Sequence, residues 1–285
     1  MLKMCLFMIA LSAQEDVKPL PEAGAFMAEV RKKMNTDERL LSEYTYVEKQ
    51  TSTKVDSKNE PQKTEVNVWE VFPGSPERVE FRRQIVKNGQ KVSAEDLGKQ
   101  DREHRKRAEA LQKKLARTSP ADLEKARAKK EREEEEFIED LFGVFEMRVV
   151  ARETLRSRST IVVDFKPRKN YKSRSKEARH MRHFQGRAWF VENELELARL
   201  ELEVIEPVSI GLGILAKLQK GAKLSAERDK FNDETWLPMK AEINLDLRIL
   251  LLKGIRIRQV YEYSDHKKYS VDTILKFPDE VAVPR

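Results

Sequence analysis

The sequence of 285 residues contains one cysteine and four histidines, and it carries no recognisable catalytic motif. Cys5 lies in the N-terminal apolar run, so a chain without that run has no thiol for disulfide or nucleophilic chemistry. His180 and His183 have a spacing that suits metal binding, but only Glu177 stands near them as a further ligand. Glycine-rich phosphate loops, a nucleophile elbow and a zinc-protease helix motif are all absent. We therefore expect no metal, no cofactor and no enzymatic activity.

The chain also lacks a large surplus of either charge. Its 56 basic and 49 acidic residues leave a net charge of +7, and most charges of opposite sign are interleaved. Because nucleic-acid binding needs basic residues gathered on one surface, a nucleic-acid partner is not expected. The one basic cluster lies within 168–187, where lipid headgroups, an acidic partner or only solvent are the alternatives. It consists of Lys169, Lys172, Arg174, Lys176, Arg179, Arg182 and Arg187.

Long hydrophobic runs are missing as well. No segment approaches the roughly twenty apolar residues that a membrane-spanning helix needs. The N-terminus has a short secretory pattern instead, in which Lys3 precedes the apolar run 4–11 and two small residues ending at Ala13. The alternative is a buried amphipathic start of the fold. The pattern predicts a signal peptide over 1–13, cleavage near Ala13, and a periplasmic mature chain of one domain over 14–285.

What the sequence has in abundance is alternation of apolar and polar residues, above all over 236–263. Two segments of that stretch place their apolar residues on one parity, with a short break at Lys253-Gly254. A period of two is typical of strands, whose successive side chains point to opposite faces. The stretch therefore predicts an antiparallel hairpin with one apolar and one charged face. The apolar parity comprises Ala241, Ile243, Leu245, Leu247, Ile249, Leu251, Ile255, Ile257, Tyr261 and Tyr263.

Shorter stretches of the same kind predict further antiparallel strands. The Asn88-Gly89 pair is the strongest short signal for a tight hairpin turn between two of them. Apolar residues spaced three and four apart predict an amphipathic helix over 23–35, and a short helix is predicted around 175–183. The strands are predicted over 44–50, 65–72, 78–87, 145–153, 160–165, 188–191, 195–205 and 218–231.

A highly charged segment, 93–140, interrupts this series of strands. Ser93 is placed to cap one helix, and Ser119 followed by Pro120 is a typical start of a second. The apolar content of the segment is low, so we predict an inserted antiparallel helical hairpin, stabilised by charge pairs and peripheral to the core. A docking arm for an anionic partner or a membrane surface is the alternative.

Four stretches of the sequence resemble one known family. They are Tyr44-Thr45-Tyr46-Val47-Glu48, the strand that leads to Val71-Phe72-Pro73-Gly74, residues 206–213 (Glu-Pro-Val-Ser-Ile-Gly-Leu-Gly) and residues 232–238 (Asn-Asp-Glu-Thr-Trp-Leu-Pro). Together they resemble the LolA-like family of periplasmic outer-membrane lipoprotein-sorting proteins, over most of the mature chain except 93–140. The resemblance implies a half-barrel, in which one strongly curved antiparallel sheet is closed by helices and holds acyl chains on its concave apolar face.

The pattern and the resemblance together predict a mainly β (α+β) fold, with a strongly curved antiparallel sheet, a helical lid and the inserted hairpin. On the concave face we expect lipid-contacting residues, namely Phe81, Leu200, Leu202, Ile243, Leu245, Leu247, Ile257 and Tyr261. An apolar stretch with two glycines but no alternation is either a buried cap of the sheet or a flap over a cavity. Its candidate flap residues are Ile210, Leu212, Ile214 and Leu215.

These residues predict a carrier or binding protein for lipid or lipoprotein acyl chains, which would also meet a membrane-associated donor or acceptor protein. One alternative is a periplasmic sensor or scaffold that uses the same fold for protein contact without bound lipid. The other is an ordinary filled β core with no ligand.

Overall fold

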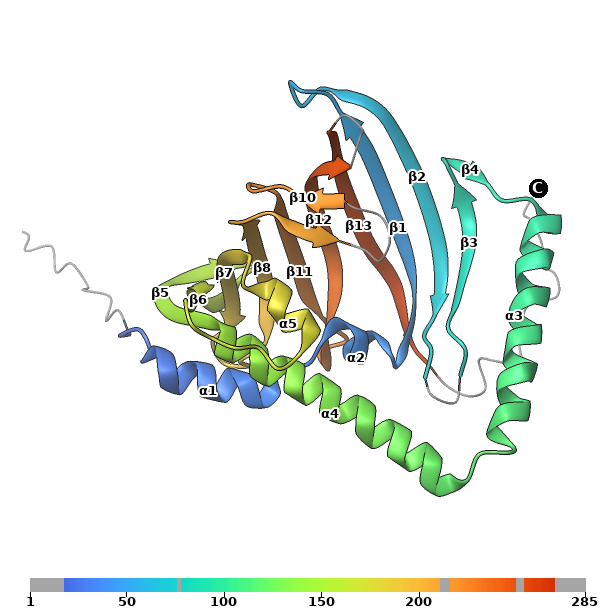
Figure 1. Cartoon of the computed structure of the whole chain (residues 1–285), viewed down its shortest axis with the longest axis horizontal. Coiled ribbons are helices and arrows are strands. Elements are labelled where there is room, and N and C mark those ends of the chain that lie inside the picture. Colours follow the sequence, from blue (N-terminus) through green and yellow to red (C-terminus); the bar gives the residue numbers. More distant parts are fainter. Residues whose placement is uncertain (1–17, 76–77, 211–215, 250–253, 270–285) are drawn as a thin grey trace, which may run out of the picture.

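A single long antiparallel sheet forms most of the molecule (Figure 1). The computed structural model describes residues 18–75, 78–210, 216–249 and 254–269. In the described part the main path of the sheet runs in the order β4-β3-β2-β1-β13-β12-β11-β8-β7-β6-β5, and the short strands β9 and β10 extend it beside β12. The strands are β1 (Tyr44–Val55), β2 (Pro61–Phe72), β3 (Phe81–Lys87), β4 (Gln90–Lys91), β5 (Phe145–Leu155), β6 (Arg158–Pro167), β7 (Phe184–Val191), β8 (Leu197–Val204), β9 (Val208–Ile210), β10 (Ala216–Leu218), β11 (Lys223–Phe231), β12 (Thr235–Ile249) and β13 (Ile255–Lys268).

Five helices in the described part accompany the sheet. The mainly β class and the open, curved antiparallel sheet are therefore confirmed. The helix α2 was not expected from the sequence, and Thr36 caps it by accepting a hydrogen bond from the backbone N–H of Arg39. No helix in the described part is long and apolar enough to cross a bilayer. The helices are α1 (Ala23–Lys33), α2 (Asp37–Leu41), α3 (Ala94–Leu115), α4 (Pro120–Val144) and α5 (Lys176–Met181).

The central hairpin β12–β13 has the register that the alternation predicts. Ala241 pairs with Tyr261 and Leu245 with Ile257, so the apolar parity lies on one face of the sheet. Asn88 and Gly89 have φ values of 50° and 81°, the left-handed conformation that a tight turn between β3 and β4 requires. Both the hairpin and this turn are confirmed.

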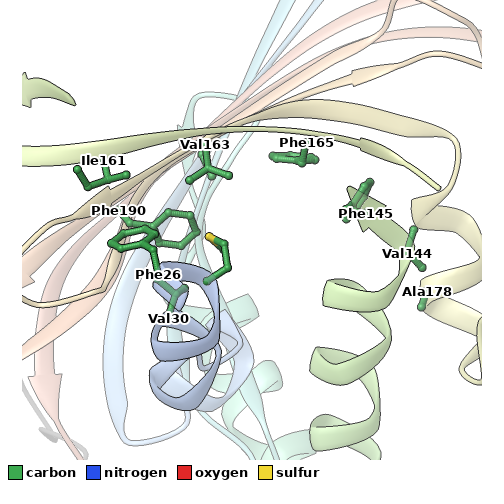
Figure 2. Close-up of a cluster of buried hydrophobic side chains, with 11 residues drawn as sticks. Phe26, Val30, Val144, Phe145, Ile161, Val163, Phe165, Ala178 and Phe190 are labelled. Atoms are coloured by element: carbon green, nitrogen blue, oxygen red, sulfur yellow. The ribbon is translucent and has the colours of Figure 1, made fainter. Parts of the chain in front are cut away.

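The main core lies between the strands β5–β8 and the helices α1, α4 and α5 (Figure 2). Phe26 and Val30 of α1 point toward Ile161, Val163 and Phe190 of the sheet. The ring of Phe26 meets the ring of Phe190 edge to face, with 6.2 Å between centroids. We call this side of the sheet the helix face and the opposite side the outer face. The residue pairs between neighbouring strands identify which residues lie on the helix face in each strand from β5 to β3.

The helix α3 lies along the edge strand β3 and is not peripheral. The side-chain amide of Gln100 accepts a hydrogen bond from the backbone N–H of Gln84 (2.8 Å) and donates one to its C=O (3.1 Å). Arg83 binds Asp101 of the same helix with a 2.8 Å Nε–Oδ1 contact. An uncovered edge strand offers unpaired backbone groups to other chains, and α3 blocks such pairing here. The helix therefore contributes to the sheet directly.

The two charged helices also do not pack on each other. Both begin where the sequence indicates, with Ser93 and Ser119 as N-caps, but in Figure 1 they diverge from the bend between them. α4 runs on to Val144, and Asp140 and Val144 are buried in its last turns. The predicted antiparallel hairpin is therefore wrong in its packing, because each helix finds a different partner in the sheet layer. Its predicted end at residue 140 falls inside α4.

We expect Gln100→Ala to lower the free energy of unfolding by about 1–2 kcal/mol, because two hydrogen bonds to the β3 edge are lost. Gln112→Ala is the matched control on the same helix, where the side chain is exposed, and it should change stability by less than about 0.5 kcal/mol. Urea denaturation of both variants measures the difference. Equal stability of the two would contradict the edge role of α3.

Candidate functional site

A stripe of apolar side chains crosses the helix face over β11, β12 and β13. The register aligns Leu224 with Ile243, and Leu245 with Ile257, so neighbouring strands continue one another's apolar positions. All of these side chains are only half-buried, although they lie on the side of the sheet that carries the core. We call these residues the apolar stripe: Leu224, Ile243, Leu245, Ile255, Ile257 and Tyr261.

Six of the eight residues predicted for the lipid-contacting face share the helix face. Leu200 and Leu202 of β8 also lie there, but they pack against the main core cluster. They therefore form the border between the filled core and the apolar stripe. The remaining four belong to the stripe, namely Ile243, Leu245, Ile257 and Tyr261.

Phe81 does not share that face. The register pairs Val71 with Arg82 and Phe72 with Phe81, which places Phe81 on the outer face. There its ring stacks on His104 of α3, with 4.2 Å between centroids. The prediction for Phe81 is wrong because alternation within one strand does not say which parity faces the helices. Only the pairing with the next strand decides that.

Of the remaining predicted residues, Leu247 and Ile210 have a described backbone position, and the other three fall outside the described residues. The backbone of Leu247 pairs with Ile255, in register with the apolar stripe. Ile210 ends the short strand β9, where its backbone pairs with Ala216 of β10. The other three flap candidates are outside the described residues, namely Leu212, Ile214 and Leu215.

In the described part, α1 and α4 contact β5 and α3 contacts β3, all of them strands outside the stripe. The helix α2 contacts β1 and also β12, which belongs to the stripe. The contact of α2 is fixed by Arg228, which binds Asp37 through its Nε at 2.8 Å. The apolar stripe, whose side chains are half-buried, thus lies in the middle of the sheet between strands that helices contact on either side.

A polar border lines the stripe on β1. The amide of Gln50 donates a hydrogen bond to the hydroxyl of Tyr261 (3.0 Å), and that hydroxyl donates to Gln259 (3.2 Å). The register pairs Gln50 with Tyr261 and Ser52 with Gln259, so these two positions of β1 place polar residues beside the stripe on this face. The stripe therefore ends at a row of hydrogen-bonding groups.

Beyond that border the same face holds an ion pair between the buried Glu48 and the more exposed Arg82, which sequence reasoning missed. Glu48 is 5% exposed and accepts two hydrogen bonds from Arg82, at 2.6 and 3.1 Å, while the Arg82 guanidinium lies over the ring of Trp69. Burial, together with the Glu48 carboxylate, raises the pKa of Tyr46 to about 12. One sequence signal could have revealed this pair. Glu48 lies on the same side of its strand as the aromatic residues Tyr44 and Tyr46.

The outer face carries a hollow of about 670 Å³ over β5–β8, β11 and β12. Ion pairs occupy its walls: Arg187 binds Asp164 at 2.7 Å, and Lys166 lies 3.5 Å from Glu146. Transfer of acyl carbons into such surroundings would displace water from charged groups, which is unfavourable. The apolar stripe lies on the helix face, on the opposite side of the sheet from this charged hollow.

His180 and His183 lie together at the end of α5, whereas His104 and His266 lie elsewhere in the structure. Burial lowers the pKa of His266, which lies beside the rings of Tyr46 and Phe231, and also lowers the pKa of His104. Among the described residues, no three His, Cys, Asp or Glu side chains are grouped so as to hold a metal ion.

The fold and the stripe define the class of protein as an open antiparallel half-barrel with a partly covered apolar face. No family model matches the chain, and no curated protein matches its sequence. Solved structures that it resembles include a LolA superfamily protein from Nitrosomonas europaea, at 9% identity and a TM-score of 0.28, with 90% of this chain and 98% of that chain covered. The resemblance to LolA-like proteins expected from the sequence is thus found among solved structures too.

Two further solved structures are similar in the same way. A putative outer membrane lipoprotein-sorting protein domain from Vibrio parahaemolyticus has 9% identity and a TM-score of 0.33, with coverage of 86% of this chain and 91% of that chain. MucB in complex with MucA from Pseudomonas aeruginosa has 8% identity and a TM-score of 0.23, with coverage of 84% and 93%. Because these scores are low, the fold assignment rests on the strand order and register given above.

Proposed function

We propose that the protein is a periplasmic binding protein that carries lipid or lipoprotein acyl chains on its helix face, and that it is not an enzyme. The observation that supports this function is the apolar stripe, whose side chains face the helix layer yet stay half-buried. A filled core would bury such residues as completely as Ile161 and Val163, which are 0% and 1% exposed. Part of the apolar surface of the stripe therefore stays accessible to a ligand.

The energetics of acyl binding suit a surface of this kind. Each methylene that leaves water contributes about 0.8 kcal/mol, so a chain laid across three strands would bind without any specific polar contact. The border of Gln50 and Tyr261 supplies hydrogen-bonding groups next to the apolar surface, where the polar end of a lipid can remain solvated. Release to an acceptor would need only a competing apolar surface.

We expect Ile257→Glu to weaken binding of a fluorescent acyl probe by about tenfold or more, while the melting temperature falls only modestly. Water already reaches this half-buried side chain, so the new carboxylate stays partly solvated but opposes an acyl chain. Arg258→Glu is the control, because its exposed side chain lies on the outer face of the same strand. Unfolding of Ile257→Glu, together with no probe binding by the wild type, would favour a filled core instead.

Native mass spectrometry of protein isolated from its own periplasm tests the proposal without a probe. A co-purifying lipid and a mature N-terminus near Gln14 are the expected result. An intact Met1 on a cytosolic product would remove both the compartment and the carrier role.

A scaffold or sensor role is the second candidate, and one observation favours it. α3 has no buried residue over its 22 residues, yet Gln100 and Asp101 fix it to β3, so it presents a charged surface in a defined position. Protein without bound lipid, whose partner capture depends on exposed charges of α3, would support this role over the carrier.

A further inference from the structure

The positive charge of the chain is concentrated in one short stretch, residues 168–182, which we call the basic segment. It contains seven basic residues and one acidic residue, a net charge of +6 within a total of +7 for the chain. The other 270 residues are therefore almost neutral in sum. The basic segment is therefore the main source of the net positive charge, which attracts anions at long range.

Most cations of the basic segment are exposed and not neutralised by a neighbouring acid. Among its described side chains, only Arg174 forms an ion pair, with Glu139 of α4 at 3.2 Å. Arg168 donates to the backbone C=O of Phe145, which leaves its charge uncompensated. The other four described cations are exposed and form no ion pair with any described acid, namely Lys169, Lys172, Arg179 and Arg182.

A buried anchor holds the basic segment in place. Asp140 of α4 is 0% exposed and accepts hydrogen bonds from the hydroxyl of Tyr171 (2.8 Å) and from the backbone N–H groups of Arg174 (2.7 Å) and Ser175 (2.6 Å). The ring of Tyr171 lies directly over Gly143, where a Cβ would come within 2.3 Å of it. The segment is thus held on a fixed support.

The short helix α5 is also held against the protein on one side. Ser175 caps it by accepting from the backbone N–H of Ala178, and Ala178 is 0% exposed against the core. Met181 packs on the same core cluster, so Arg179 and Arg182 are left on the exposed side. Burial of one side of the segment directs its cations outward.

We propose that the basic segment docks the protein on the surface of an anionic lipid membrane. Exposed cations spread over a loop and a helix suit mobile lipid headgroups, which rearrange to meet each charge. An acidic peptide would need a groove between them, and the hollow described above, beside β6 and β7, is lined by acids as well as bases. Docking is independent of whether the apolar stripe binds lipid, although it would bring the stripe to a bilayer.

Co-sedimentation with vesicles tests the proposal. The wild type is expected to pellet with vesicles of phosphatidylcholine and phosphatidylglycerol but not with phosphatidylcholine alone, and added salt should weaken the binding. The variant Lys169→Glu/Lys172→Glu/Arg179→Glu should lose about tenfold or more in affinity. The control is the variant Arg105→Glu/Lys113→Glu/Lys114→Glu, which changes exposed residues of α3 by the same total charge and should keep wild-type binding.

Three results would overturn membrane docking. They are no binding of the wild type to anionic vesicles, equal losses in the two triple variants, and binding of polyglutamate through the same residues without any vesicle binding. Thermal melting should show that both triple variants stay folded. The acyl probe separates the two proposals, because the basic-segment variant should bind it normally while Ile257→Glu should still pellet with anionic vesicles.

Discussion

Gly186→Ala is expected to lower the free energy of unfolding by about 3 kcal/mol or more, because the added methyl group has no room between the strands. A Cβ at this position in β7 would lie 1.9 Å from the backbone oxygen of Glu201 and 2.7 Å from Cζ of Phe165. The carbonyl belongs to the paired strand β8 and cannot move without breaking the ladder there. Strands that approach this closely require a residue without a side chain.

Urea denaturation measures this loss, and Gly98→Ala is the control. Gly98 lies within α3, where a new Cβ would meet only the flexible end of Arg102 at 3.3 Å. Alanine favours helix over glycine, so this variant should be more stable by about 0.5–1 kcal/mol. A Gly186→Ala variant as stable as the wild type would mean that the two strands are not held at this separation.

Asp140→Ala is expected to lower the free energy of unfolding by about 3–5 kcal/mol, because it removes the buried carboxylate that accepts three hydrogen bonds. Although burial alone would raise it, the pKa of Asp140 is lowered, since hydrogen bonds from Ser175, Tyr171 and Arg174 favour the carboxylate. A lowered folded-state pKa stabilises the protein fully above the unfolded value of about 3.9. The contribution is lost as the pH falls through the lower, folded-state value.

The stability difference between wild type and Asp140→Ala should therefore stay constant from neutral pH to about pH 5 and shrink below about pH 4. Glu139→Ala is the control one residue earlier, because this carboxylate is 43% exposed and should contribute less than about 1 kcal/mol. Equal effects of the two substitutions would show that Asp140 does not anchor the basic segment.

Gly186 and Asp140 stabilise the covered part of the sheet at two different places. Gly186 allows the close approach of β7 and β8 next to Phe165, which lies in the main core. Asp140 ties the chain between β6 and β7 to the end of α4. Together they fix the covered part of the sheet, beside which the apolar stripe remains half-buried. Substitutions in the stripe are therefore expected to leave this core folded.

Local signals in the sequence determined most elements of the fold. Alternating apolar residues predict β12 and β13 with one apolar face, because the pleat of a strand has a period of two. Ser93 and Ser119 mark the starts of α3 and α4, since an N-cap hydroxyl satisfies a backbone N–H of the first turn. The left-handed turn at Asn88-Gly89 follows from residue type as well. Each of these features depends on neighbours in the chain.

Only the tertiary structure decided which elements meet. It placed Phe81 on the outer face, set Gln100 against the β3 edge, and paired Arg82 with the buried carboxylate of Glu48. It also joined Asp140 to donors more than thirty residues away. Such contacts depend on strand register and helix placement, which many residues fix jointly through burial. A periodic pattern gives the two faces of a strand, but only pairing with its neighbours decides which face is covered.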